Sequence, residues 1–230
     1  SDVYKRQVEK MMKKFYEMAS SISYFNEIVY EKYNERNPIK NHYENISGIY
    51  KYRNKIGIKN AILRKNKDLI FGIFLEIGKN KKINTIDTET KALIRKNINL
   101  IDKEFRKNQQ YADQFKNILR SKYNLSSILK TMKSLGVLQK YIPEFSEVVG
   151  QMQFDLFHVY TVDEHTFKVV RNIRQMKLNE HAGFELEYEI LNKIRKIEIL
   201  YIAGIFHDLG KGKGGDPVSY THLRAHETQR

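Results

Sequence analysis

The chain has 230 residues, with 41 lysines and arginines against 27 aspartates and glutamates, and it contains no cysteine. This length suits one or two domains with a sizeable buried core, and the lack of cysteine excludes disulfides, thiolate zinc sites and cysteine nucleophiles. No stretch approaches the roughly 20 apolar residues of a membrane span, and the N-terminus lacks a signal-peptide core. We therefore expect a cytoplasmic protein with no membrane partner.

The net charge of +14 raises the question of a nucleic-acid partner, because clustered lysines and arginines gain affinity by releasing counterions from phosphates. Here the basic residues are instead spread through amphipathic segments beside many asparagines. The two densest patches, 64–67 and 79–82, lie near predicted loops. We interpret the charge as a solvated basic surface, and a nucleic-acid partner is not expected.

Most of the chain repeats apolar residues at the three- and four-residue steps of amphipathic helices. The predicted helices cover residues 8–33, 67–78, 88–100, 102–120, 126–135, 163–176, 186–196 and 197–208. Asn37 and Pro38 end the first helix, and the alternation over 49–58 predicts a short hairpin that turns at 53–55. We find no internal repeat. The sequence therefore predicts an all-α fold.

The two ends of the chain differ from the rest in composition and periodicity. Residues 1–7 and 217–230 resemble translated sequencing-adaptor read-through, and we expect both to be artefacts. For that reason we give no weight to His222 and His226, although their spacing of four would suit a metal. Beyond Gly150, histidines and acids appear among aromatics, so we predict one domain over 8–149 and the start of another over 150–216.

The apolar segment 197–208 ends in two adjacent ionisable residues, His207 and Asp208. Burying an unpaired carboxylate is costly, so Asp208 needs a partner. A divalent metal is one such partner, since imidazole and carboxylate both ligate these ions; a hydrogen-bonded pair that caps the helix is the other. His165 lies on an earlier predicted helix with an apolar face, so a helical hairpin could bring the two imidazoles together.

His165 followed by His207 and Asp208 resembles the HD superfamily of metal-dependent phosphohydrolases, which ligate metal through a His, a His-Asp doublet and a later Asp. Three blocks, 136–143 (GVLQKYIP), 150–165 and 207–216 (HDLGKGKGGD), are similar in order and spacing to the central region of bacterial protein-PII uridylyltransferase/uridylyl-removing enzymes. The resemblance implies a helical connector domain followed by the first helices of a truncated HD bundle.

The resemblance implies that the parent enzyme attaches UMP to a tyrosine of the PII nitrogen-signalling protein when glutamine is low. Its HD domain then removes the UMP when glutamine is high. The implied metal ligands are His165, His207 and Asp208, the metal is Mg²⁺ or Mn²⁺, and Asp208 is also oriented toward the nucleophilic water.

Further residues of the same blocks have implied roles, and for all of them except Lys211 a second interpretation is open. Lys211 would hold a phosphoryl oxygen, and the glycines of 210–215 would let backbone N–H groups approach the same anion or would simply form a flexible loop. Asp155, His158 and Asp163 would orient the metal ligands or serve in packing.

The chain also departs from the family pattern. It has no counterpart of the nucleotidyltransferase signature, it reaches the adaptor-like tail before the last metal aspartate, and it lacks the C-terminal domains that sense glutamine. We therefore expect the fragment itself to be inactive, although its parent would be an enzyme with both activities. Two alternatives stay open: another HD phosphohydrolase that acts on free nucleotides, and a non-catalytic basic helical module that binds RNA.

Overall fold

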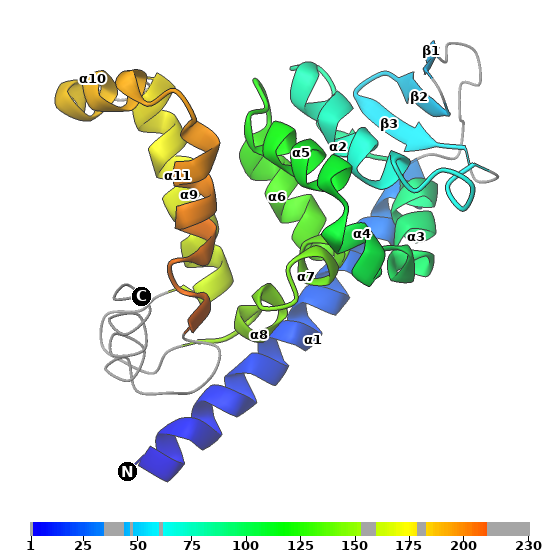
Figure 1. Cartoon of the computed structure of the whole chain (residues 1–230). Helices are drawn as coiled ribbons and strands as arrows, with labels where there is room; N and C mark the ends of the chain where they lie inside the picture. Colours follow the sequence, from blue (N-terminus) through cyan, green and yellow to red (C-terminus); the bar gives the residue numbers. More distant parts are fainter. Residues whose placement is uncertain are drawn as a thin grey trace. The chain divides into compact units, whose positions relative to one another are not determined.

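A computed structural model describes residues 2–34, 44–46, 48–59, 62–152, 160–178 and 183–210 (Figure 1). The chain divides into two compact units, Ser1–Glu17 with Pro143–Arg230, and Met18–Ile142. Helix α1 (Asp2–Asn34) contributes residues to both. Among the described residues, the helices are too short or too polar to cross a bilayer. The predominantly helical fold confirms the all-α prediction, with one small sheet added to it.

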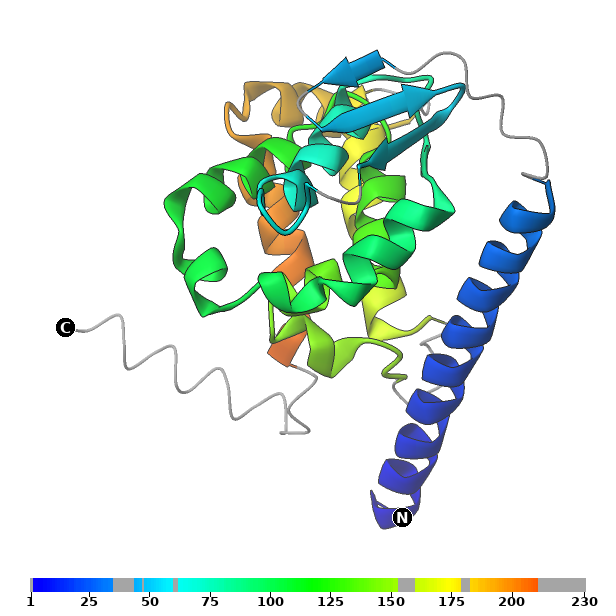
Figure 2. The same ribbon diagram turned by 90° about the vertical axis from the view of Figure 1, so that its right-hand side faces the viewer.

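The sheet lies in the unit Met18–Ile142, where its first strands are the blue and cyan arrows of Figure 2, and its strands have the order β1-β2-β3-β4. Its strands are β1 (Glu44–Ile46), β2 (Ile49–Tyr52), β3 (Lys55–Ile58) and β4 (Thr85–Ile86). The predicted hairpin is confirmed: β2 and β3 pair antiparallel and Tyr52 faces Lys55. The turn between them holds Arg53 in the left-handed region, at φ 51°. Strand β4 pairs with β3 in parallel.

Besides α1, the described residues of this unit form seven helical segments: α2 (Leu69–Lys79), α3 (Thr88–Lys96), the 3-10 helix η1 (Ile98–Leu100), α4 (Lys103–Lys107), α5 (Gln109–Leu119), α6 (Leu125–Ser134) and α7 (Val137–Tyr141). The prediction of one helix over 102–120 was wrong in one respect, because Asn108 separates α4 from α5. Its side chain accepts a hydrogen bond from the Gln110 N–H (2.8 Å), which satisfies a free donor at the start of α5.

The core of this unit contains a cluster of aromatic rings around Phe71 of α2. Phe71 meets Phe105 and Tyr141 edge to face at centroid distances of 5.2 and 4.9 Å, and Tyr111 stacks on Phe105. The Tyr111 hydroxyl donates to Asp68 (2.9 Å). Burial, together with this hydrogen bond, raises the pKa of Tyr111 to about 12. The cluster joins α2, α4, α5 and α7.

Lys91 of α3 holds the second half of α1 in this unit. Its buried ammonium lies 2.6 Å from the Glu27 carboxylate and 3.1 Å from that of Glu31. Burial alone would lower the pKa of Lys91, but the two carboxylates outweigh it and the pKa is raised. The guanidinium of Arg95 lies 4.0 Å from the ring centroid of Tyr24, so three α1 side chains contact α3.

The other unit is built from helices α8 (Phe145–Val148), α9 (Val162–Leu178), α10 (Glu185–Lys193) and α11 (Ile197–Phe206), with the first half of α1. Helices α9 and α11 lie side by side (Figure 1). They approach closely at Gly204, where an added Cβ would lie only 3.4 Å from Val169 and 3.6 Å from Val170. Lys13 of α1 donates to the carbonyl of Glu147 at 2.7 Å.

Candidate metal centre

His165 lies in the first turn of α9, which is fixed by hydrogen bonds to the segment before it. The Val162 N–H donates to the carbonyl of Gln151 (2.9 Å), and the carboxylate of Asp163 accepts from the Gly150 N–H (3.1 Å). Asp163 is buried, and this bond fastens residues 150–151 to the start of α9. The contact gives Asp163 a packing role; whether it also orients the metal ligands stays a prediction.

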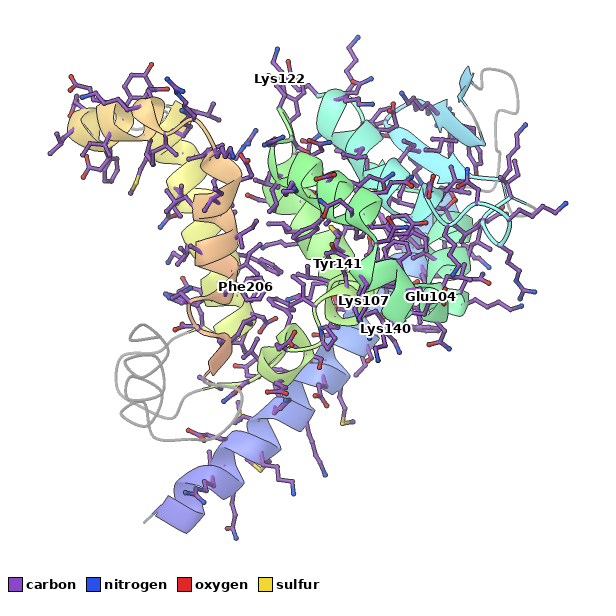
Figure 3. The ribbon with its side chains drawn as sticks, in the orientation of Figure 1. Glu104, Lys107, Lys122, Lys140, Tyr141 and Phe206 are labelled. Carbon is purple, nitrogen blue, oxygen red and sulfur yellow. The ribbon has the colours of Figure 1, made fainter. Side chains whose placement is uncertain are left out.

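His207 and Asp208 directly follow α11. The His207 N–H donates to the carbonyl of Ala203 (2.9 Å), so the helical bonding continues to His207. Phe206, the last residue of the helix, is 44% exposed (Figure 3). Helices α9 and α11 pack together along their lengths, so the first turn of α9, which contains His165, lies near the end of α11.

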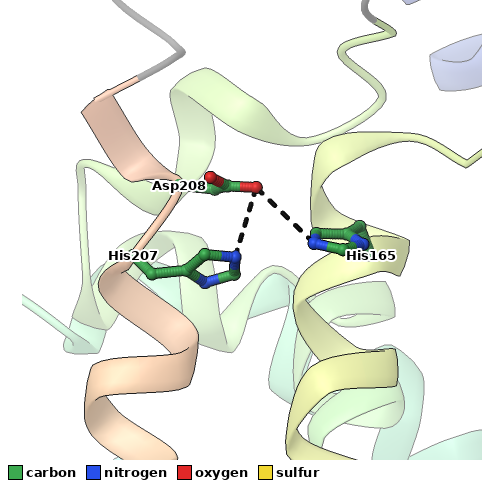
Figure 4. Close-up of side chains that lie close together, drawn as sticks. All are labelled: His165, His207 and Asp208. Atoms are coloured by element: carbon green, nitrogen blue, oxygen red, sulfur yellow. Dashed lines mark ion pairs between the residues drawn. The ribbon is translucent and has the colours of Figure 1, made fainter. Parts of the chain in front are cut away.

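The structure brings the three predicted residues together (Figure 4). Oδ2 of Asp208 lies 3.3 Å from Nε2 of His207 and 3.8 Å from Nε2 of His165. The two imidazole rings are 5.5 Å apart between centroids. One ligand atom from each residue lies within 4.8 Å of the others. A capping pair at the end of α11 would need only His207 and Asp208, so the presence of His165 favours a shared ligand over a simple cap.

The ring of His207 has a defined orientation. Its Nδ1 lies 2.7 Å from the carbonyl oxygen of Gly204. A carbonyl oxygen can only accept, so Nδ1 carries the proton of the neutral ring and the lone pair is on Nε2. Nε2 is the atom that faces Asp208. Metal-binding histidines commonly fix their second nitrogen on a backbone carbonyl in this way.

The donor set fits a divalent cation. Two ligand atoms at about 2.1 Å from one ion lie roughly 3 to 4 Å apart, and the distances of 3.3 and 3.8 Å fall in that range. The Asp208 side chain is only 9% exposed, whereas those of His165 and His207 are 41% and 37% exposed. The carboxylate is therefore buried at the base of the cluster, and the imidazole edges are accessible from solvent.

Gly204 is the functional position that the sequence analysis missed. It provides the carbonyl for His207 and, having no side chain, allows α11 to approach α9. A glycine inside an apolar helical segment often has a packing reason, which is the signal that could have revealed it. The predicted residues Lys211, Asp155 and His158 lie outside the described residues, as do His222 and His226, to which we gave no weight.

The lysines that contribute to the positive charge are dispersed over the surface of one unit. Lys107, Lys122 and Lys140 are exposed and lie on different elements of the unit Met18–Ile142 (Figure 3). Lys107 belongs to α4, Lys122 follows α5, and Lys140 belongs to α7. Their placement is compatible with the solvated surface that the sequence predicts.

The helical unit with a His on one helix and a His-Asp pair at the end of its neighbour defines an HD-type protein, and residues 162–229 match the HD domain family model. Residues 51–141 match the model described as "Uridylyltransferase GlnD third domain". Over these regions, the chain belongs to the family of bifunctional uridylyltransferase/uridylyl-removing enzymes.

Curated relatives that carry that name cover most of the chain. The protein of Nitrosococcus oceani is 35% identical over 215 residues, and that of Methylococcus capsulatus is 35% identical over 220; each alignment covers 91% of this chain and 24% of the relative. The Legionella pneumophila (strain Lens) protein is 40% identical over 172 residues, which are 74% of this chain and 20% of the relative. No solved structure matches significantly. The chain thus spans about a quarter of the length of these relatives.

The two matched regions lie on either side of the predicted boundary between residues 149 and 150. That boundary stays a prediction, as does the interpretation of 1–7 and 217–230 as artefacts. Residues 2–7 continue helix α1, and the HD match extends into the second of these segments.

Proposed function

We propose that the chain is the part of a bifunctional uridylyltransferase/uridylyl-removing enzyme that carries the hydrolytic HD site. In the parent enzyme this site would remove UMP from a uridylylated tyrosine of a cytoplasmic PII signal protein. The observation that carries the proposal is the convergence of His165, His207 and Asp208 within 4.8 Å, in a chain whose relatives are named for uridylyl removal.

The HD match supports a divalent metal at this cluster. His165 and His207 would hold the ion through Nε2, and Asp208 through its carboxylate. When bound, a divalent ion supplies positive charge that acidifies water and offsets phosphoryl charge. The buried Asp208 carboxylate balances that charge and would accept a hydrogen bond from the attacking water. Lys211 would hold a phosphoryl oxygen as a point charge.

The proposed hydrolysis needs little further acid catalysis. The water oxygen attacks phosphorus, the bond from phosphorus to the tyrosine oxygen breaks, and UMP and the free tyrosine are the products. The leaving phenolate has a pKa of about 10, so it departs more readily than a serine alkoxide. The proton from water passes to Asp208 or to solvent.

The metal would be Mg²⁺ or Mn²⁺, and the donor set favours the second. Mg²⁺ prefers oxygen ligands and gives up its waters reluctantly, whereas Mn²⁺, although the weakest binder of the first-row divalent series at mixed nitrogen and oxygen sites, accepts imidazole more readily than Mg²⁺ does. Two of the three ligands are imidazoles. Glutamine would control the activity through C-terminal domains of the parent, and we propose that the 230-residue chain alone is inactive.

The test uses the complete gene product that contains this chain and measures the release of UMP from uridylylated PII protein. We expect His207→Ala to reduce the rate by at least about 100-fold, and Asp113→Asn, an exposed carboxylate outside the cluster, to leave it unchanged. Hydrolysis of free nucleotides with no release from PII would favour the alternative HD phosphohydrolase. Nanomolar RNA binding that His207→Ala does not change would favour the non-catalytic RNA-binding module.

A further inference from the structure

Lys168 lies one helical turn after His165 on α9, beside the metal cluster. Residues three apart on a helix are neighbours on its surface, with Cβ atoms about 5–6 Å apart. Helical side chains also lean toward the N-terminus of their helix. The Lys168 side chain therefore extends back toward the first turn of α9, which holds one of the proposed metal ligands.

A contact with Tyr160 shows where the ammonium group of Lys168 lies. Its Nζ is 4.4 Å from the centroid of the Tyr160 ring, which is a cation–π distance. Tyr160 comes two positions before Val162, the first residue of α9. The ring is 49% exposed. The ammonium group is thus held at the surface, at the end of the helix where His165 lies.

Two other basic residues of α9 serve in packing, and Lys168 does not. Arg174 forms a hydrogen bond with the hydroxyl of Tyr201 on α11, and Lys177 donates to a carbonyl of α10 at 2.8 Å. Lys168 contacts the Tyr160 ring instead, and it forms no ion pair with the carboxylates that the structure describes. Its positive charge is therefore free to meet an anionic ligand.

A positive charge at this place has a cost, because the neighbouring cluster is itself proposed to bind a cation. An ammonium group repels a divalent ion. The cluster offers one carboxylate, that of Asp208, which neutralises only part of the charge of the ion. The metal-loaded site beside Lys168 is thus positive, and an anion that contacts both the ion and the ammonium group offsets the repulsion. A phosphoryl group, with several oxygens, is such an anion.

We propose that Lys168 binds a phosphoryl oxygen of the nucleotide substrate at the metal centre, and that Tyr160 positions the ammonium group for this contact. The inference rests on the function proposed above and adds two residues to its site. UMP carries more negative charge than the phosphodiester from which it is released. Lys168 would therefore stabilise the charge that develops on the phosphoryl group as water attacks, acting as a point charge.

The test is isothermal titration calorimetry of the purified chain with UMP, inorganic phosphate and uridine at saturating Mn²⁺. Lys168→Met keeps most of the side chain and removes its charge. We expect it to weaken the binding of UMP and of phosphate by at least about 10-fold. Uridine, which lacks the phosphate, should show no difference. Mn²⁺ should bind as tightly as in the wild type or more tightly, because a repelling charge has been removed.

Arg171→Met is the matched control. It removes the same charge from an exposed position on the same helix, one turn farther from His165. Salt screens charges at that distance, so the affinity for UMP should change by less than about 2-fold. Lys168→Arg keeps the charge and should retain most of the affinity. Unchanged circular dichroism spectra would verify that the variants fold.

The role of Tyr160 is tested by two substitutions. Tyr160→Phe keeps the ring that holds the ammonium group, so it should bind UMP as the wild type does. Tyr160→Leu removes the ring, and we expect it to weaken UMP binding by about 2- to 5-fold without changing the affinity for Mn²⁺. Equal UMP affinities of these two variants would show that Tyr160 does not position Lys168.

UMP binding that Lys168→Met leaves unchanged would overturn the proposal, as would the absence of UMP binding by the Mn²⁺-loaded wild type. An equal loss of uridine binding would also overturn it, because recognition of the phosphate would not be the cause. Failure of the proposed function has a different result. The complete gene product would then release no UMP from the PII protein, while Lys168→Met would still weaken UMP binding by the purified chain.

Discussion

The carboxylate of Asp208 lies 3.8 Å from the imidazole of His165, although 42 residues separate them in the chain. Packing of α9 on α11 produces this proximity, and His207 joins the pair from the same end of α11. A buried carboxylate with two imidazoles at its edge is a ready set of metal ligands. Stability and ligand geometry at the site therefore both depend on how these two helices meet.

The first prediction concerns the choice of metal. Because two of the three proposed ligands are nitrogen atoms, we expect the chain to bind Mn²⁺ at least about 10-fold more tightly than Mg²⁺. Isothermal titration calorimetry of the purified chain with each ion measures this ratio. His165→Ala should reduce the preference, since it removes one nitrogen ligand. Tighter binding of Mg²⁺ would show that the imidazoles are not ligands.

The second prediction concerns the contact at Gly204. In Gly204→Ala the new methyl group would lie in ordinary van der Waals contact with α9, so we expect a change in unfolding free energy of less than about 1 kcal/mol. Gly204→Val adds two further methyl groups, and overpacking of this kind costs about 1–3 kcal/mol. It should also weaken metal binding, because α11 must shift away from His165. Urea denaturation and metal titration of both variants measure these effects. Equal unfolding free energies and equal metal affinities of the two variants would contradict the close approach of α11 to α9 at Gly204.

The third prediction concerns the tautomer of His207. Its Nδ1–H donates to Gly204, so a bound ion should be held by Nε2. Nitrogen-15 NMR of the imidazole with Zn²⁺ as a diamagnetic probe distinguishes the two nitrogens. We expect a large shift of the Nε2 resonance and a retained proton on Nδ1. Coordination through Nδ1 would show that the Gly204 hydrogen bond is not part of the site.

The fourth prediction concerns acid stability. Glu76 lies 2.8 Å from Lys51 and 2.7 Å from Lys79. Burial would raise its pKa, but the hydrogen bonds from both lysines outweigh it, and the pKa is lowered from 4.5. A lowered pKa in the folded state stabilises the fold above pH 4.5, and this contribution is lost as the pH falls through the folded value.

Glu76→Gln should therefore reduce the unfolding free energy by about 1 kcal/mol at pH 7. The difference from wild type should shrink as the pH falls below 4.5. Urea denaturation at several pH values measures it, with the exposed Glu89→Gln as the control. A difference that stays constant down to pH 3 would mean that the effect is not electrostatic.

Much of the fold could be predicted from the sequence, because long amphipathic segments carry their own periodicity. The helices α1, α2, α6, α9, α10 and α11 and the β2–β3 hairpin follow such patterns. Strand β4 has two residues and α8 has four, too few for any period to be visible. These elements are fixed by neighbours such as Ile56, which pairs with Ile86 across the sheet.

The residues of the site also include some that the sequence predicts and one that it does not. The residue types and order of His165, His207 and Asp208 carry a recognisable motif, so these three could be predicted. The role of Gly204 could not, because it arises from the distance between two packed helices and from the rotation of one imidazole ring. Such features depend on tertiary packing and leave little trace in a single sequence.

The most direct test of the metal centre is a titration of the purified chain with Mn²⁺, followed by electron paramagnetic resonance. We predict saturable binding of one ion per chain in the wild type. His165→Ala and Asp208→Asn should each weaken that binding by at least about 10- to 100-fold, while Asp113→Asn should not. Absence of saturable binding, or equal binding by the wild type and the cluster variants, would contradict the assignment of these three residues as metal ligands.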